Sequence, residues 1–207
     1  MLTKIELLEP QRRDVLLNAA LKEFVTKGYD EASTNIIAKE AGISKGLMFH
    51  YVNSKKDLFF FVYDYFTDMM DREYFGLMNY NEKDILERLR QSYLLQLELI
   101  RKHPWIFELN KLSNAVYPDE IKKELEKKSV DKQMPCIEQM FESIDESKFR
   151  DDLDINKCKQ FILWSNIGFT NQILEDARNS EYDKLDYDSI VKKLDDNLQE
   201  LRKIFYK

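Results

Sequence analysis

The chain has 207 residues, of which 43% are hydrophobic and 34% charged, a balance that excludes a disordered chain and a membrane-embedded one. Its formal net charge of −6 excludes a protein that is basic throughout. Residues 1–60 nevertheless carry nine Lys or Arg against eight Asp or Glu, whereas the remainder carries 23 against 30. Gly and Pro together number only nine, and so few turn formers favour an all-α fold of long helices.

The first predicted element is a helix over residues 11–27, whose apolar residues between Val15 and Val25 recur at helical spacing. Pro10 precedes this segment, and proline is common at the start of a helix. Gly28 follows it, and glycine is common in the left-handed position that ends a helix.

Residues 34–56 predict two short helices joined by a tight turn, followed at once by the start of a long helix. Ser33 or Thr34 can cap the first short helix, and Ser44 can cap the second. Gly42 permits a sharp turn between them. A helix, a turn of about three residues that contains glycine, and a second short helix form a helix-turn-helix arrangement.

The segment from Ile37 to Leu58, IAKEAGISKGLMFHYVNSKKDL, resembles the DNA-binding signature of the tetracycline-repressor (TetR-like) family. The similar positions include Ala-Gly-Ile-Ser-Lys-Gly across the turn, His-Tyr at the end of the recognition helix, and Ser-Lys-Lys-Asp-Leu at the opening of the next helix. The resemblance implies an all-α protein of about nine helices. It also implies a three-helix DNA-binding head, residues 1–54, and a helical effector-binding and dimerisation body, residues 55–207. The implied function is a transcriptional regulator, a repressor that binds a palindromic operator as a homodimer and is released by a small-molecule effector.

The candidate DNA-binding residues lie in and around the second short helix, residues 45–51, which can enter a major groove about 12 Å wide. They are Thr34, Ser44, Lys45, Gly46, Leu47, Phe49, His50, Tyr51 and Lys55. Lys45 is the charged candidate for reading base edges, and Lys55 is placed for a phosphate contact. A glycine in a helix costs roughly 1 kcal/mol against alanine, so Gly46 indicates close approach to DNA, the alternative being a tolerated surface glycine. For His50 the alternative is a solvated or packed histidine.

Two positions depart from the family pattern. Related sequences commonly have Thr where this chain has Leu47 and Tyr where it has Phe49, so the helix lacks two hydroxyl groups. We expect Phe49 to pack on the sugar-phosphate backbone or on a thymine methyl group. The same departures are the best support for an alternative function, an all-α dimeric interaction protein of the same fold that acts through protein contacts without binding DNA or a ligand.

The rest of the chain predicts further helices, over about residues 55–74, 82–103, 105–116, 118–144 with a break near Gln133, 155–178 and 187–206. Residues 160–174 are apolar around much of the helix, which predicts burial on more than one side, and Gly168 is expected to let another helix come close. We place the last two helices, about residues 155–178 and 187–206, at a homodimer interface arranged as a four-helix bundle.

The resemblance further implies a pocket in the body for a small, largely apolar or aromatic effector. The candidate residues are Tyr93, Trp105, Phe107, Met134, Trp164, Asn166 and Phe169. Aromatic residues at helical spacing are more often plain core, so core packing is the competing interpretation. Asn166 sits in an apolar context and needs a hydrogen-bonding partner, either on a ligand or across the dimer.

Other functional classes find little support in the sequence. Only two histidines are present, and no Gly-rich phosphate loop or nucleophile elbow indicates an enzyme. Cys136 and Cys158 form no metal-binding pattern, so we expect two reduced thiols, no metal and no cofactor. Residues 1–13 lack an apolar signal core, and residues 160–174 are too short and polar to span a bilayer, so we expect a cytoplasmic protein with no membrane partner.

Overall fold

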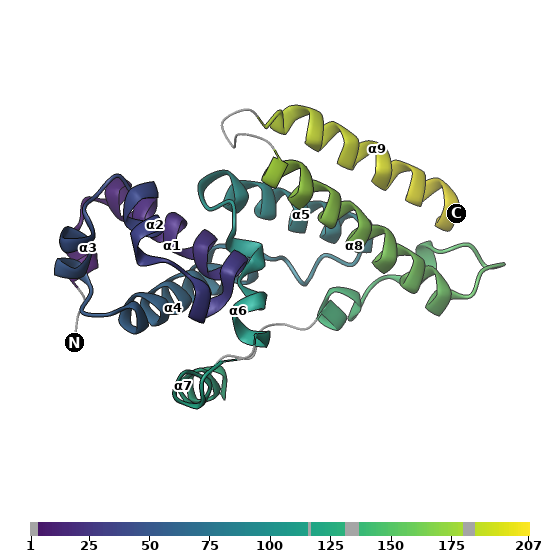
Figure 1. Cartoon of the computed structure of the whole chain (residues 1–207). Helices are drawn as coiled ribbons and strands as arrows, with labels where there is room; N and C mark the ends of the chain where they lie inside the picture. The colour runs from purple at the N-terminus through teal and green to yellow at the C-terminus, as the bar shows by residue number, and fades with distance from the viewer. Residues whose placement is uncertain (1–3, 116, 131–136, 180–184) are drawn as a thin grey trace. The chain divides into compact units, whose positions relative to one another are not determined.

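The computed structural model of the chain describes residues 4–115, 117–130, 137–179 and 185–207 (Figure 1). Over these ranges the chain forms nine α-helices and five short 3₁₀ turns. The same ranges contain no β-strand beyond one isolated antiparallel bridge, between Phe149 and Tyr206. The predicted all-α fold class is therefore confirmed.

The α-helices are α1 (Pro10–Glu31), α2 (Thr34–Glu40), α3 (Lys45–Tyr51), α4 (Lys55–Glu73), α5 (Ile85–Lys102), α6 (Asn110–Asn114), α7 (Asp119–Val130), α8 (Ile155–Asn179) and α9 (Tyr187–Phe205). The 3₁₀ turns are η1 (Lys4–Leu7), η2 (Phe75–Leu77), η3 (Ile106–Glu108), η4 (Ile137–Phe141) and η5 (Glu146–Lys148). The four long helices α4, α5, α8 and α9 match their predicted ranges to within three residues at each end.

Two predicted helices were wrong in detail. The helix predicted over residues 105–116 is instead η3 followed by the five-residue α6. The segment lies between Pro104 and Pro118, and Ser113 and Asn114 near its end favour turns over helix interiors. Residues 137–141 form a 3₁₀ turn rather than the continuation of an α-helix, and the predicted break near Gln133 lies outside the described residues.

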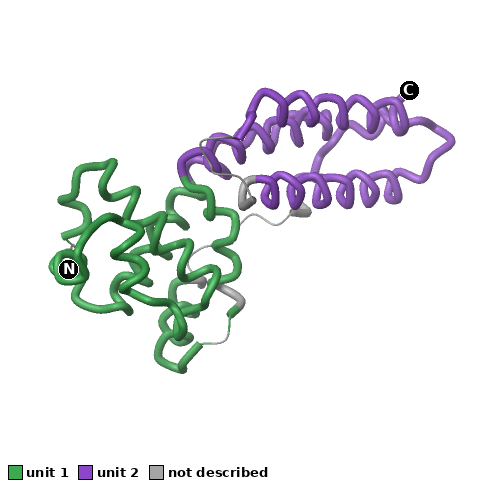
Figure 2. The backbone as a smooth tube through the Cα atoms, turned by 45° about the horizontal axis from the view of Figure 1, so that its top comes forward, with its two compact units in different colours: residues 1–71, 103–134 green, residues 72–102, 135–207 purple. Residues whose placement is uncertain are grey.

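The chain divides into two compact units, which Figure 2 colours separately. Unit 1 consists of Met1–Asp71 and His103–Met134, and unit 2 consists of Arg72–Lys102 and Pro135–Lys207. This packing division falls near the end of α4. The functional division predicted from the sequence, with residues 1–54 binding DNA and residues 55–207 forming the body, concerns role rather than packing and stays a prediction.

The core of unit 1 is organised around α1, which packs against α2 and α6. Its fully or almost fully buried residues include Leu16, Leu17, Ala20, Leu21 and Phe24 of α1, Ile37 and Ala38 of α2, Met48 of α3, and Leu58 and Phe59 of α4. The rings of Phe24 and Phe59 meet edge-on at 5.2 Å and so join α1 to α4. The predicted break at Gly28 is confirmed, because its φ of +73° interrupts the helical geometry of α1 there.

Unit 2 is built from α5, α8 and α9, which pack on one another (Figure 1). One charged residue lies inside this unit: Arg88 of α5 is only 1% exposed. Its Nε donates to the carbonyl of Glu82 at 2.9 Å, and its Nη1 donates to the carbonyls of Met140 and Glu142, both at 2.9 Å. Nη2 donates to the carbonyl of Tyr80 at 2.8 Å and also to that of Glu82. The guanidinium therefore ties the start of α5 to η4 and to the residue that follows it.

A second buried charge, Asp84, joins the two ends of unit 2. Its side chain accepts hydrogen bonds from Lys148 Nζ at 2.8 Å, Arg202 Nη1 at 3.1 Å and the Tyr206 hydroxyl at 2.8 Å. The residue is 3% exposed. Burial alone would raise the pKa of this carboxyl, but the hydrogen bonds from these three residues outweigh it and lower the pKa to about 2.

This depressed pKa predicts an acid-sensitive contribution to stability. Because the folded pKa lies below the unfolded value, the contribution is fully present above about pH 4 and is lost as the pH falls toward 2. We expect the free-energy difference between wild type and Asp84→Asn to be about 2 kcal/mol at pH 7 and to shrink over that window. Urea unfolding at several pH values, followed by the fluorescence of Trp164 in a Trp105→Phe background, measures it.

The control for this prediction is Asp195→Asn, which removes an exposed carboxylate paired with Arg90 at 2.7 Å. Exposed ion pairs contribute little, so this variant should unfold like wild type at every pH. A pH-independent difference between wild type and Asp84→Asn would show that Asp84 does not titrate in the predicted window.

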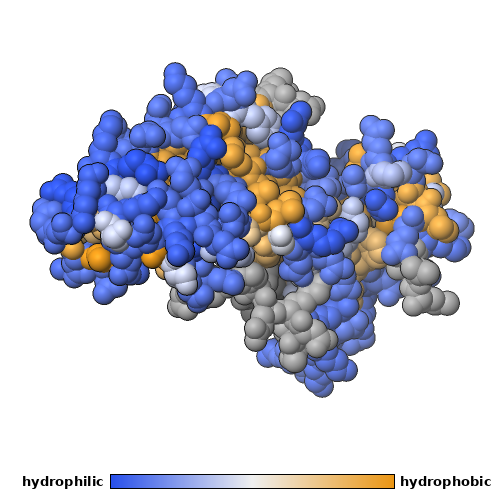
Figure 3. Space-filling view, turned by 180° about the vertical axis from the view of Figure 1, so that it is seen from behind, coloured by the Kyte–Doolittle hydropathy of each residue, from blue (hydrophilic) through white to orange (hydrophobic). Residues whose placement is uncertain are grey.

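Large apolar side chains remain exposed on α8. Phe161, Trp164 and Ile167 are 52%, 54% and 42% exposed, at a spacing of three residues along the helix, and half of Ile204 on α9 is exposed as well. On the face drawn in Figure 3 hydrophilic residues predominate, and hydrophobic residues gather in bands among them. Within one chain, the prediction that residues 160–174 are buried on more than one side therefore does not hold, because one row of their apolar side chains stays about half exposed.

The expectation for Gly168 is also not met within one chain. A Cβ built at this position would meet no atom within 4 Å, so no helix of the same chain approaches it closely. A partner molecule that covers Phe161, Trp164 and Ile167 would bury the second side of the helix and could also approach Gly168 closely.

Three further findings bear on other predictions. Cys158 is a buried free thiol, and Cys136 lies outside the described residues. In the part of the chain that the structure describes, no group of three or more His, Cys, Asp and Glu side chains is placed to hold a metal ion. No helix in that part combines the length and the apolar character needed to cross a membrane.

Candidate nucleic-acid interface

The turn between α2 and α3 is fixed by its backbone. The N–H of Gly42 donates to the carbonyl of Lys39 at 3.1 Å, and the N–H of Ile43 donates to that of Ala38 at 3.0 Å. This hydrogen-bond pair is the Schellman motif, which needs a left-handed residue after the helix. Gly42 supplies it with a φ of +67°, as the sequence predicted.

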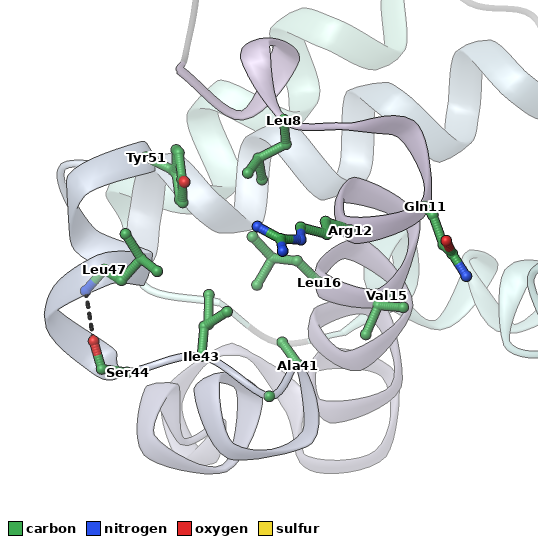
Figure 4. A pocket seen from close by; sticks show the side chains of 11 residues that line it. Leu8, Gln11, Arg12, Val15, Leu16, Ala41, Ile43, Ser44, Leu47 and Tyr51 are labelled. Carbon is green, nitrogen blue, oxygen red and sulfur yellow. Dashed lines mark hydrogen bonds between the residues drawn. The ribbon is translucent and has the colours of Figure 1, made fainter.

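Caps set where the two short helices begin. The Ser33 side chain accepts a hydrogen bond from the N–H of Ile36 at 3.5 Å, so Ser33 rather than Thr34 caps α2. The Ser44 side chain accepts from the N–H of Leu47 at 3.1 Å and caps α3 (Figure 4). Because Ser44 uses its oxygen as the acceptor, its hydroxyl hydrogen is left to donate to a ligand.

Helix α3 has an inward and an outward side. Met48 and the capping residue Val52 are buried and hold the helix on the head. The outward side carries Lys45, Gly46, Leu47 and His50, all exposed, with Leu47 at 42%. No Asp or Glu occurs on α3, so the outward side offers a cation and apolar surface with no local negative charge.

Aromatic neighbours support two of the outward side chains. The ammonium group of Lys45 lies 5.9 Å from the centroid of the Phe49 ring, within the range of a cation–π contact. His50 and Tyr51 pack edge-on, with ring centroids 5.7 Å apart. Lys45 and Phe49 therefore form one unit, in which the ring guides the ammonium group.

The two lysines at the start of α4 differ in what they bind. Lys55 Nζ donates to the carbonyl of Asp30 at 3.0 Å and lies 5.1 Å from the centroid of the Tyr29 ring. An ammonium group has three N–H donors, so two remain for a phosphate. Lys56 instead pairs with Glu120 and Glu124 of α7, at 2.5 and 3.1 Å. Lys55 is therefore the lysine of α4 that suits a nucleic-acid contact.

All nine candidate DNA-binding residues lie in unit 1: Thr34 in α2, Ser44 at the cap of α3, Lys55 in the first turn of α4, and the other six in α3. Thr34 is the first residue of α2 and is half-buried, as are Phe49 and Tyr51. The role of each residue in binding DNA stays a prediction.

The candidate effector residues are only partly brought together. In unit 2 the hydroxyl of Tyr93 donates to the backbone carbonyl of Asn166 at 2.9 Å, and its ring meets that of Phe169 edge-on at 5.2 Å. Burial raises the pKa of Tyr93, which keeps this hydroxyl protonated. Trp164 is exposed on the same helix, α8. Trp105 and Phe107 are half-buried in unit 1, and Met134 lies outside the described residues.

A buried polar cluster in unit 2 was missed by the sequence analysis. The hydroxyls of Tyr74 and Ser92 lie 2.6 Å apart, and the Gln96 side-chain amide donates to both at 3.1 Å. The available signal was the spacing of Ser92 and Gln96, which falls inside the apolar stripe of α5.

A cleft beside α3 was also missed. Its volume is about 490 Å³, and it is lined by Leu8, Gln11, Arg12, Val15, Leu16, Ala41, Gly42, Ile43, Ser44, Leu47 and Tyr51 (Figure 4). The fold brings residues 8–16 beside residues 41–51, so no local sequence pattern announces the cleft.

Comparison with known proteins agrees with this geometry. The family model described as "Bacterial regulatory proteins, tetR family" matches residues 16–62, which contain α2, α3 and the start of α4. The chain is 25% identical over 160 residues to the HTH-type transcriptional repressor KstR2 of Mycolicibacterium smegmatis, covering 73% of this chain and 74% of that protein. It is 31% identical over 90 residues to the uncharacterized HTH-type transcriptional regulator YuxN of Bacillus subtilis, covering 44% of this chain and 29% of that protein.

Two solved structures share the fold. The ketosteroid transcriptional regulator KstR2 of Mycobacterium tuberculosis has a TM-score of 0.60 and 19% identity, over 97% of each chain. A TetR family transcriptional regulator from Chloroflexus aurantiacus has a TM-score of 0.55 and 16% identity, over 99% of this chain and 97% of that one. The family match, the sequence relatives and the shared fold lead to one conclusion. Residues 16–62 match the tetR family of bacterial regulatory proteins, and the chain is a TetR-like DNA-binding transcriptional regulator.

Proposed function

We propose that the protein is a homodimeric repressor that binds a palindromic operator through α3 of each protomer and leaves it when a small effector binds the body. The observation that carries the DNA contact is the outward side of α3, which presents Lys45, Leu47 and His50 with no carboxylate on the helix. A Schellman turn precedes α3, and α3 is a capped helix of seven residues. A short helix that is presented in this way can insert into a major groove. Because duplex DNA is the proposed ligand, we propose that the protein works in the cytoplasm.

Dimerisation through α8 and α9 is supported by the exposed apolar row. Phe161, Trp164 and Ile167 of α8 and Ile204 of α9 would be covered if two copies met through these helices in a four-helix bundle. Gly168 lies on the same helix and has open space above it, so a partner helix can come close there. Two copies would present two α3 helices to half-sites one turn of DNA apart, about 34–36 Å.

For the effector we propose a small, largely apolar or aromatic molecule that binds within unit 2. Tyr93 and Phe169 supply aromatic surface there, and Ser92, Gln96 and Tyr74 supply hydrogen-bonding groups on α5 and next to α4. The name of the related Mycobacterium tuberculosis protein refers to ketosteroids. An apolar molecule with a carbonyl or hydroxyl group is therefore the first class to screen, by thermal shift and by release of bound duplex.

Selection from a random duplex pool at low salt tests the DNA-binding function. We expect the wild-type protein to retain related, inverted-repeat sequences, and its affinity for them to fall linearly in log–log form with salt concentration, because phosphate contacts release counterions. A protein that retains no duplex would instead fit the alternative, a dimer of the same fold that acts through protein contacts. The naming of its relatives as transcriptional repressors does not favour that alternative.

Lys45 and Lys55 are predicted to have different effects on specificity. Lys45→Ala should reduce discrimination between the selected duplex and random DNA by about 1–3 kcal/mol, because the ammonium group on the outward side of α3 reads base edges. Lys55→Ala should weaken binding to both duplexes about equally, because a phosphate contact carries no sequence information. Fluorescence anisotropy titrations with both duplexes measure this, and equal behaviour of the two variants would contradict the assignment.

A further inference from the structure

The cleft beside α3 contains one charged side chain. Arg12 is exposed near the start of α1, and its guanidinium points into the cleft toward the wall that carries Leu47 and Tyr51 (Figure 4). None of the other residues that line the cleft is charged. The cleft is therefore electropositive, although the protein as a whole is acidic.

The neighbouring arginine, Arg13, is not placed in the cleft as Arg12 is. The guanidinium of Arg13 lies 5.6 Å from the ring centroid of Tyr65, and the Tyr65 hydroxyl donates to Asp14 at 3.3 Å. Arg13 is thus part of the packing of α1 on α4. Within the described ranges Arg12 makes no hydrogen bond and no ion pair, so no carboxylate of those ranges neutralises its positive charge.

The walls of the cleft add donors of the same kind. Ser44 keeps its hydroxyl hydrogen, since its oxygen is used to cap α3. Tyr51, which carries a hydroxyl group, lines the cleft as well, whereas the Gln11 side chain points away from Arg12 (Figure 4). A guanidinium together with hydroxyl donors, and without a carboxylate, is chemically matched to a phosphate group, whose two free oxygens fit the guanidinium fork.

The position of the cleft indicates which kind of phosphate group could reach Arg12. One wall is α3, the helix whose outward side faces DNA in the proposed function, so the anion that comes within reach is the backbone beside the groove that α3 enters. The other wall is held firmly, because Leu16 at its base is almost fully buried and Ile5 of η1 is fully buried in the same unit. Arg12 is therefore carried on a fixed helix beside α3 rather than on a loose arm.

We propose that Arg12 binds a phosphodiester of the operator strand that borders the groove, with the hydroxyls of Ser44 and Tyr51 as secondary donors. This contact would fix how deeply and at what angle the head sits on DNA. It lies upstream of residues 16–62, the part of the chain that matches the family model. The inference rests on the proposed DNA binding.

The salt dependence of binding to the duplex selected by the wild-type protein tests the contact. Losing one phosphate contact in each half-site lowers the slope of log K against log salt by about 0.9 per contact, or about 1.8 for a dimer. We expect Arg12→Gln to show this lower slope and an affinity at least about tenfold weaker, with unchanged sequence preference. Lys27→Gln, at the other end of α1, is the matched control and should bind like wild type.

A chemical change in the DNA locates the contact. Duplexes that carry a single uncharged methylphosphonate linkage, moved one position at a time, should reveal a phosphate that matters to wild type but not to Arg12→Gln. Equal salt slopes for the two proteins, with both still binding, would overturn the role of Arg12 and leave DNA binding intact. A changed sequence preference with an unchanged slope would likewise overturn it, in favour of a base contact. No salt-dependent binding by wild type would overturn the proposed function itself.

Discussion

Arg88→Met should destabilise unit 2 by about 3 kcal/mol or more, since each buried carbonyl left without a donor costs about 1–3 kcal/mol. Arg88 is 1% exposed, and its guanidinium donates to the carbonyls of Tyr80 and Glu82 before α5, of Met140 in η4 and of Glu142 just after η4. Methionine fills similar space but donates no hydrogen bond. Urea unfolding, followed by circular dichroism and by Trp164 fluorescence in a Trp105→Phe background, measures the loss.

The matched control for this prediction is Arg90→Met, two residues further along the same helix. Its guanidinium is partly exposed and pairs with Asp195 through Nε at 2.7 Å and Nη2 at 3.1 Å, an arrangement that contributes at most about 1 kcal/mol at a surface. Arg88→Lys should fall between the two, because an ammonium group cannot reproduce the five-donor fork. Equal stability of Arg88→Met and Arg90→Met would mean that water replaces the guanidinium at no cost.

Trp164→Asp should convert a dimer into a monomer and weaken binding to the selected operator by about 100-fold or more, the scale of avidity gained when two linked modules bind together. The side chain is 54% exposed within one chain, so the fold of the protomer should survive the change. If the exposed row on α8 forms the proposed interface, the new carboxylate would have to be desolvated there, which costs several kcal/mol. Sedimentation velocity gives the oligomeric state, and anisotropy gives the affinity.

Leu77→Asp provides the control for the dimer experiment. Leu77 is an exposed apolar residue of unit 2 in η2, outside α8 and α9, and its replacement should leave both the oligomeric state and the operator affinity unchanged. Dimers formed by Trp164→Asp at the wild-type concentration would show that the exposed row on α8 is not the interface.

The head could be predicted from the sequence because its determinants are local. Gly42 and Ser44 each act within five residues, through a left-handed turn or a cap, so reading the chain in order finds them. The long helices were found for a related reason. The apolar residues of α9, from Ile190 to Phe205, recur at helical spacing without interruption.

The buried charges could not be predicted in the same way. Arg88 and Asp84 read as surface residues, and they are buried because their partners come from residues 139–142 and 148–206, far along the chain. The sequence does contain one sign of these buried polar groups. Arg88, Ser92 and Gln96 recur every four residues on the buried side of α5. Polar residues that keep the register of an apolar stripe therefore mark groups with long-range partners.

The exposed row of α8 shows a different limit. Periodicity indicated that the helix is apolar around much of its circumference, but it does not say whether a given side is covered by the same chain or by another molecule. The cleft at Arg12 has a comparable origin, because it exists only where α1 and α3 are brought side by side. In both cases the pattern is read correctly along one element, and the missing information concerns its neighbours.

The two sides of α3 also bear on how such a regulator changes over evolution. Met48 and Val52 hold the helix in place, while Leu47 and His50 contribute little to the packing of the head. Under the proposed function, substitutions at the outward positions would alter which promoter is recognised without a preceding loss of stability that would have to be compensated. After gene duplication, one copy could then acquire a new set of target genes through a few changes in seven residues, while the other helices fold as before.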